Sequence, residues 1–227
     1  MIKTASYSRL IDFETCRFKA YLKHVAYVPD PKPNTASLRG TAIHETIETW
    51  MRGNGPASPE AMKHFDKELN ALQRRHQEGL VSLEGKWGFN QQWEPTEYKK
   101  AWLKMKADAI VTLAPTKAIV IDYKTGKRFG NELKHGEQCQ LYAIATFIRN
   151  PKLEEIITEL WYFDQNELAS YPMTRKAATY AMKSFDKRLK RMTSATDFPP
   201  NPNAFSCKYC PYKSNDLGGT GHCKTGV

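Results

Sequence analysis

The stretch LKMKADAIVTLAPTKAIVIDYK, residues 103–124, decides the fold. In its first half apolar and polar side chains alternate, which places Lys104, Lys106 and Asp108 on one face. Pro115-Thr116 is a turn signal, and the run that follows it is rich in strand-forming residues. The stretch therefore predicts a β-hairpin with strands over 103–113 and 117–124. We expect one apolar face on the first strand, formed by Leu103, Met105, Ala107 and Ala109.

The second strand ends in the triplet Asp122-Tyr123-Lys124. Asp122 and Lys124 share a face because side chains repeat every two residues, and Asp108 lies on the neighbouring strand. Two carboxylates from adjacent strands suit a hard cation such as Mg²⁺ or Mn²⁺, with the Tyr123 carbonyl as a further oxygen ligand. A lysine beside such an ion could position water or offset negative charge on phosphorus. Alone, a D-x-K triplet is a weak signal, and a solvated strand end with an ion pair explains it equally well.

Size and charge narrow the class of protein. The chain has 227 residues, enough for one large domain with a buried core. Its formal net charge of +10 favours polyanionic partners, nucleic acid first, although the same charge can serve solubility alone. No apolar run approaches the length of a membrane span, and the first residues lack the apolar core of a signal peptide. We expect no membrane partner and a location in the cytoplasm of a bacterium or a phage-infected host.

The remaining segments alternate helical and extended patterns. Apolar spacing predicts helices over residues 8–25, 38–51, 58–78, 133–149 and 174–193. A proline-rich loop is expected over 28–37, short strands within 86–102, and a second hairpin over 154–173. This order predicts an α/β fold with a mixed central sheet flanked by helices. The turn-rich tail after residue 198 cannot build an apolar core, so it needs a staple or a docking site.

Two of the predicted helices carry further polar candidates. His44 lies one turn before Glu48, and Gln138 lies one turn before Tyr142 on the helix that follows the D-x-K strand. A lone helical histidine is usually a surface or satisfied core residue, and Gln138 with Tyr142 fits an ordinary amphipathic helix. None of these residues indicates catalysis by itself.

In their order along the chain, four segments resemble one family: RGTAIHE (39–45), KADAI (106–110), VIDYKTG (120–126) and QCQLY (138–142). They resemble the RecB-type branch of the PD-(D/E)XK nuclease superfamily, over most of the chain from Ser6 to Cys223. The resemblance implies a restriction-endonuclease-like core in a single domain over residues 1–227. It implies Mg²⁺ or Mn²⁺ ligands at His44, Asp108, Asp122 and the Tyr123 carbonyl, the catalytic lysine at Lys124, and lysine-orienting or DNA-contacting roles for Gln138 and Tyr142. One position departs from the pattern, since Ala107 stands where a proline can precede the first aspartate.

Three of the five cysteines cluster near the C-terminus, as CKYC (207–210) followed by Cys223. Such spacing suggests a metal or iron–sulfur site before disulfides. With Cys16 the pattern resembles members of the superfamily in which one N-terminal and three C-terminal cysteines hold a [4Fe–4S] cluster. That resemblance implies four ligands, Cys16, Cys207, Cys210 and Cys223, although the gap before the last is longer than the family commonly has. Four thiolates also suit tetrahedral zinc, and His222 could replace one of them.

Either metal would staple the tail to the first helix. Cys139 lies within a predicted helix, and we expect it to be a small buried filler.

Basic side chains supply candidates for contacts with DNA. They are Arg39, Lys104, Lys106, Lys187, Arg188 and Arg191. The last three belong to a strongly basic segment over 183–191, which a solvated helix face explains equally well. The chain contains no Walker A motif, so it has no ATP motor of its own. We expect DNA as the partner, with a helicase, a single-strand annealing protein or an oligomer supplying processivity.

The resemblance implies a divalent-metal-dependent DNA exonuclease that acts on ends, with a single-strand preference. Its setting would be recombination, repair or phage DNA processing, because the compact chain is similar to stand-alone phage-encoded nucleases of this type. A structure-selective endonuclease and a non-catalytic DNA-binding or assembly subunit are the alternatives.

Overall fold

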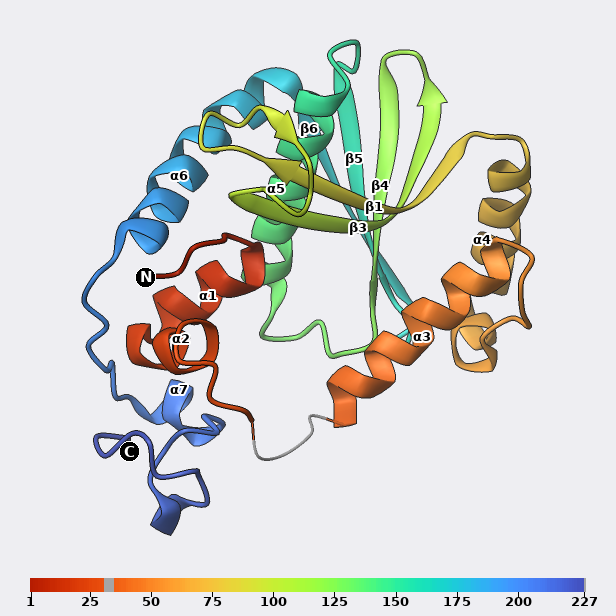
Figure 1. Ribbon diagram of the computed structural model, residues 1–227. Coiled ribbons are helices and arrows are strands. Elements are labelled where there is room, and N and C mark those ends of the chain that lie inside the picture. The colour runs from red at the N-terminus through yellow and green to blue at the C-terminus, as the bar shows by residue number, and fades with distance from the viewer. Residues whose placement is uncertain (31–34, 227) are drawn as a thin grey trace.

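A six-stranded sheet forms the centre of the molecule, with strand order β2-β1-β3-β4-β5-β6. The computed structural model describes residues 1–30 and 35–226 (Figure 1). β4 and β5 are parallel, and the other neighbouring strands are antiparallel. The predicted mixed α/β sheet is thus confirmed. The strands are β1 (Val81–Phe89), β2 (Pro95–Thr96), β3 (Leu103–Ala114), β4 (Lys117–Lys124), β5 (Glu155–Tyr162) and β6 (Glu167–Thr174).

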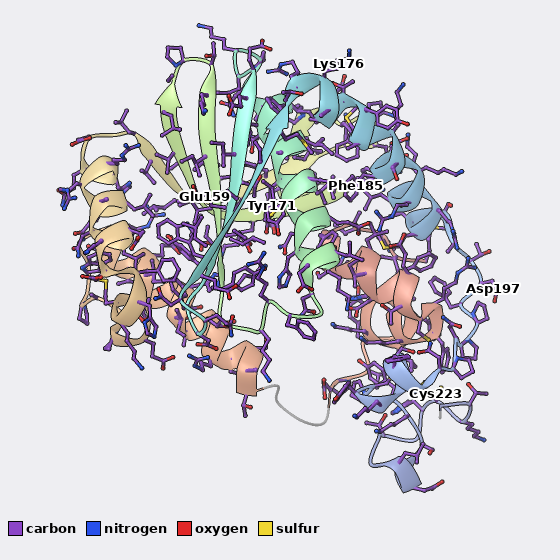
Figure 2. All side chains as sticks on the ribbon, turned by 180° about the vertical axis from the view of Figure 1, so that it is seen from behind. Glu159, Tyr171, Lys176, Phe185, Asp197 and Cys223 are labelled. Carbon is purple, nitrogen blue, oxygen red and sulfur yellow. The ribbon has the colours of Figure 1, made fainter. Side chains whose placement is uncertain are left out.

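Helices cover both faces of this sheet. α5 (Glu132–Arg149) and α6 (Arg175–Ser194) lie on one side, and α3 (Thr35–Met51) and α4 (Pro59–Gln77) lie on the other (Figure 1). One apolar cluster joins the sheet to α5 and α6, with Phe185 between these two helices (Figure 2). A second cluster joins the opposite face to α3 and α4. Because β4 and β5 are parallel, a crossover must connect them, and α5 is that crossover, beginning at Glu132 after a short link from Lys124.

Both predicted hairpins are confirmed. β3 pairs with β4 from Ala109 opposite Ile121 onward, with a register shift near the turn. β5 pairs with β6 along its whole length. The strand expected within 86–102 begins earlier, because β1 starts at Val81 and pairs with β3.

β3 does not keep one apolar face. Met105 and Ala107 pack in the cluster with α5, whereas Ala109 and Val111 pack in the cluster with α3. The change occurs at Asp108, where the pairing with β1 is interrupted opposite Glu84. Glu84 has φ 51°, a left-handed conformation that is uncommon outside glycine. The expectation of a single face from Leu103 to Ala109 is therefore wrong, because the two strands turn at this point.

The helix predicted over 8–25 is two helices, α1 (Tyr7–Thr15) and α2 (Arg17–His24). They are separated by Cys16, whose backbone is extended at φ −159° and ψ 115°. The tail holds this break in place, since the Asn201 N–H donates to Cys16 Sγ at 3.4 Å. The tail itself contains α7 (Ala204–Lys208) and a 3₁₀ turn over Asn215–Leu217.

The proline-rich loop is shorter than predicted. α3 begins at Thr35, inside the predicted range of 28–37, and residues 31–34 of that range lie outside the described residues. Leu38 on α3 is 61% exposed, so it is not part of the apolar side that Ile43 and Ile47 form. Within the described ranges, no helix has the length and apolar character needed to cross a membrane.

Candidate active site

One pocket brings together all seven residues that the nuclease-like segments of the sequence singled out. It lies where α3 and α5 approach the middle of β3 and the end of β4. Its lining includes His44, Asp108, Asp122, Tyr123, Lys124, Gln138 and Tyr142. Gly40 allows α3 to come this close, because a Cβ there would lie 2.9 Å from Thr125 Oγ1.

Asp108 sits where the β3–β4 ladder stops. The last backbone pair is Ala109 with Ile121, and beyond it the Tyr123 N–H donates to Asp108 Oδ2 at 2.7 Å. The N–H and C=O of a strand residue point to the same side, so the Tyr123 carbonyl also faces Asp108. The other carboxylate oxygen, Oδ1, lies 2.9 Å from Nδ1 of His44. A residue from α3 and one from β3 thus meet at the end of β4.

Asp122 and Lys124 are held by α5 in a closed ring of polar contacts. The Lys124 ammonium donates to Gln138 Oε1 at 2.8 Å, and Gln138 Nε2 donates to the Tyr142 hydroxyl at 2.8 Å. The Tyr142 hydroxyl donates to Asp122 Oδ1 at 3.1 Å, and Asp122 Oδ2 lies 2.5 Å from the Lys124 ammonium. Gln138 and Tyr142 are one helical turn apart, which lets one helix reach both ends of the D-x-K triplet.

Burial and charge shift the acid–base behaviour of these groups. Burial raises the pKa of Asp108, and the charge of Asp122 adds to this rise, although the hydrogen bond from His44 opposes it. Burial would lower the pKa of His44, but the hydrogen bond to Asp108 and the charges of both aspartates raise it. Burial and the charge of Asp122 raise the pKa of Tyr142 well above its usual value, so its hydroxyl remains a hydrogen-bond donor.

The carboxylates of Asp108 and Asp122 and the Tyr123 carbonyl are the kinds of ligand that a hard divalent cation prefers. They are not arranged around a single point. Among residues 1–30 and 35–226, no group of three His, Cys, Asp or Glu side chains is arranged to hold a metal ion. Oδ2 of Asp122 is nevertheless buried without a hydrogen bond of normal geometry. Its partner is the Lys124 ammonium, so this oxygen already faces a positive charge. A divalent cation would find hard oxygen ligands here in the carboxylates of Asp108 and Asp122 and in the Tyr123 carbonyl.

The sequence pattern missed His135, which also lines the pocket. Burial and the charge of Lys124 lower the pKa of this histidine to about 4. Its Nδ1 lies 2.7 Å from the Tyr162 hydroxyl. His135 is therefore a neutral polar group at neutral pH. Its place three residues before Gln138 on α5 was the signal that could have found it.

A second, larger cavity of about 640 Å³ opens beside the pocket, between the start of α1, β3 and the start of α5. The two share four residues, Lys106, His135, Gln138 and Tyr142. Its lining is rich in cations, which are Arg9, Lys23, Lys104, Lys106 and Lys134, against one acid, Asp12. We call this cavity the basic groove.

The candidate DNA contacts fall into three settings. Lys104 and Lys106 line the basic groove, and Lys106 is also ion-paired with Glu84. Lys187 and Arg191 are exposed on α6. The other two arginines have carboxylate partners: Arg39 pairs with Glu60 and Asp164, and Arg188 pairs with Glu14 and Glu137.

The four cysteines line one small pocket between the α1–α2 break and the tail. They are Cys16, Cys207, Cys210 and Cys223, and none of them is in a disulfide. Cys223 lies in the tail beside α7, away from the sheet (Figure 2). His222 is not among the lining residues, and its Nδ1 lies 2.7 Å from Thr220 Oγ1. Cys139 is buried on α5, as expected of a filler.

Comparison with known proteins bears on the family and the fold of the chain. The family model of the PD-(D/E)XK nuclease superfamily matches residues 4–215. A search of curated proteins finds no significant match. A crystal structure from Eubacterium rectale, provisionally named an exonuclease, is similar at TM-score 0.50 and 14% identity, over 88% of this chain and 84% of that one.

Two further structures are similar at lower scores. The structure of SSO0001 has TM-score 0.47 and 17% identity, over 99% of this chain and 88% of that one. An alkaline exonuclease from Laribacter hongkongensis has TM-score 0.28 and 14% identity, over 84% and 92% respectively.

Proposed function

Because the chain belongs to the PD-(D/E)XK nuclease superfamily, we propose that it is a divalent-metal-dependent deoxyribonuclease that degrades DNA from its ends. The observation that carries the proposal is the ring of Asp122, Lys124, Gln138 and Tyr142. An ion pair that merely solvates a strand end would be exposed. Here both members are largely buried, with side-chain exposures of 17% for Lys124 and 6% for Asp122. Because the Asp122–Lys124 pair is buried and is bridged by Gln138 and Tyr142, a catalytic role for the pair is favoured over a solvated strand end.

His44, Asp108, Asp122 and the Tyr123 carbonyl would hold Mg²⁺ or Mn²⁺. The bound ion would supply an activated water and neutralise charge on the phosphate. Hydrolysis joins the water oxygen to phosphorus and breaks the bond from phosphorus to the 3′ oxygen. The 3′ oxygen leaves with a proton as a hydroxyl, and the other product carries a 5′-phosphate.

The chain's own residues would position this reaction. Gln138 directs the Lys124 ammonium, which can donate to the attacking water or to a phosphate oxygen. The Tyr142 hydroxyl fixes the orientation of the Asp122 carboxylate. Because these contacts already exist, little rearrangement would be needed when the negative charge on phosphorus grows.

The basic groove supports DNA as the substrate. It is continuous with the pocket through Lys106 and Gln138, and its excess of cations suits a phosphate backbone. We infer that one DNA strand lies in this groove, with Lys104 and Lys106 at phosphates near the scissile bond. A helicase, a single-strand annealing protein or an oligomer would then supply processivity.

The test compares linear and circular single-stranded DNA in Mn²⁺. Wild-type protein should degrade the linear molecule and spare the circle, whereas cutting of the circle would favour a structure-selective endonuclease. Asp122→Ala and Lys124→Ala should abolish cleavage while the fold, followed by circular dichroism, stays intact. Asp197→Ala and Lys176→Ala are matched controls, because both residues are exposed (Figure 2). Absence of cleavage by the wild type in Mn²⁺ would favour the non-catalytic DNA-binding subunit.

We also propose that Cys16, Cys207, Cys210 and Cys223 hold a [4Fe–4S] cluster, with Zn²⁺ as the alternative. Their shared pocket supports this, as does the N–H of Asn201 directed at Cys16 Sγ, since hydrogen bonds to sulfur accompany iron–sulfur ligation. Anaerobically purified wild-type protein should show a broad absorption band at about 400 nm. The Cys16→Ser variant should lack this band, and the Cys139→Ser variant should keep it. A colourless wild type that contains zinc would identify Zn²⁺ instead, and a metal-free wild type would refute both.

A further inference from the structure

The loop that follows the catalytic strand carries a phenylalanine fully out in solvent. Phe129 is 91% exposed, and Leu133, four residues further along at the start of α5, is 88% exposed. We propose that Phe129 is a base-stacking contact, which receives an unpaired nucleobase of the DNA strand at the mouth of the active site. The proposal rests on the proposed nuclease function, and it adds a binding element that none of the catalytic residues supplies.

The loop presents Phe129 at the apex of a tight turn. The Asn131 N–H donates to the Arg128 carbonyl at 2.9 Å, and Gly130 has φ 80°. An i to i+3 hydrogen bond with glycine at positive φ is the pattern of a type II turn, which places Phe129 at its first central position. The Asn131 side chain donates to the Lys127 carbonyl at 2.9 Å and ties the two ends of the loop together. Phe129 is therefore held outward by its backbone.

The turn is part of the rim of the active-site pocket. Lys127 and Asn131, two residues to either side of Phe129, both line that pocket. Two residues of extended chain span at most about 7 Å, so the Phe129 backbone lies within that distance of the rim. Lys134 and His135, just beyond Leu133, line the basic groove. In Figure 1 this link between β4 and α5 passes between α1 and α3, below the sheet.

The surroundings favour nucleic acid as the occupant. Phe129 shares a shallow pocket with two bases, Lys127 and Arg128, and two acids, Glu132 and Glu167. Arg128 and Glu167 pair at 3.0 Å, which leaves Lys127 and Lys134 against one acid, Glu132, beside the two apolar side chains. A phosphate backbone meets the lysines, and a base offers the ring a flat apolar face. Paired bases hide their faces in the duplex, so this contact would select for unpaired DNA and would give the single-strand preference a physical cause.

The test measures DNA binding without cleavage, by fluorescence anisotropy of a labelled single-stranded oligonucleotide in EDTA. Phe129→Ala should raise the Kd about tenfold, since stacking of one base on an aromatic ring contributes roughly that much. Phe129→Trp should restore the affinity. Phe205→Ala is the matched control, because Phe205 is 93% exposed on α7, and it should bind as the wild type does. An oligonucleotide with abasic sites should bind wild type and Phe129→Ala equally.

Three results would overturn the inference. Phe129→Ala could bind like Phe205→Ala, or it could weaken the ordinary and the abasic oligonucleotides alike. The wild type could instead form a dimer in sedimentation that Phe129→Ala abolishes, which would make this surface an interface between copies. The proposed nuclease fails separately: a wild type that binds through Phe129 but never cuts DNA in Mn²⁺ would refute catalysis and leave the stacking contact standing.

Discussion

The Lys124 ammonium donates a 2.8 Å hydrogen bond to the side-chain oxygen of Gln138, a residue on a different element. The lysine comes from the end of β4, and its partner comes from α5, the next element along the chain. The long side chain of Lys124, at the end of its strand, is thereby held by a residue of a different element. The orientation of Lys124, for which we propose a catalytic role, therefore depends on how α5 docks.

Replacing Gln138 by alanine should lower kcat about 10-fold to 100-fold with little change in KM. Such losses are usual when a residue that orients a catalytic group is removed. Steady-state cleavage of a labelled oligonucleotide in Mn²⁺ measures both constants. Gln140→Ala on the exposed face of the same helix is the control. A rate for Gln138→Ala within a factor of about two of the control would argue against the positioning role.

Replacing Tyr142 by phenylalanine keeps the buried ring and removes one hydroxyl. Asp122 then loses a donor and Gln138 loses an acceptor, so we expect kcat to fall about tenfold. The double variant Gln138→Ala/Tyr142→Phe should lose less than the product of the two single effects, because both act on one network. Fully multiplicative losses would show that the two residues act independently. Tyr180→Phe, at an exposed position, is the control.

Arg188 should matter more for stability than for DNA binding. Its guanidinium joins α6 to Glu14 on α1 and Glu137 on α5, and its side chain is 24% exposed. Arg188→Met leaves two carboxylates without their partner, so the free energy of unfolding in urea should fall by about 1–3 kcal/mol. Lys187→Met, next to it and exposed, should change that free energy by less than about 0.5 kcal/mol. The reverse order, with the larger effect on DNA affinity, would favour Arg188 as a phosphate contact.

Asp12 should make the free energy of unfolding depend on pH in the acid range. Burial would raise the pKa of this carboxyl, but hydrogen bonds and charge from His24, Lys19 and Lys23 outweigh it and lower the pKa. A depressed folded-state pKa contributes stability above the unfolded pKa of about 4 and loses it as the pH falls toward the folded value. Between pH 6 and pH 3 the wild type should therefore lose more unfolding free energy than Asp12→Asn. Parallel losses in urea titrations would contradict the assignment.

Much of the fold and site could be predicted from local patterns. The β3–β4 hairpin follows from alternation and the Pro115-Thr116 turn, and the shared face of Gln138 and Tyr142 follows from helical spacing. What could not be predicted depends on distant partners. The rotation of β3 at Asp108 accompanies the left-handed Glu84 on another strand, and the helix break at Cys16 is bound by Asn201. The partners of Arg39 and Arg188 could not be predicted for the same reason. Asp164, which pairs with Arg39, and Glu14, which pairs with Arg188, each lie more than a hundred residues away along the chain.

The contact between the two ends of the chain also sets an order of events. Cys16 and the Thr15 carbonyl meet Asn201, and the Val28 carbonyl accepts from the Tyr212 hydroxyl. During synthesis the first helices emerge long before Asn201 and Tyr212 exist, so these contacts form late. A product cut short before residue 201 would carry the whole candidate active site yet leave its N-terminal helices unclamped. The clamp on the N-terminal helices can therefore form only after Asn201 and Tyr212 have been synthesised, later than every residue of the candidate active site.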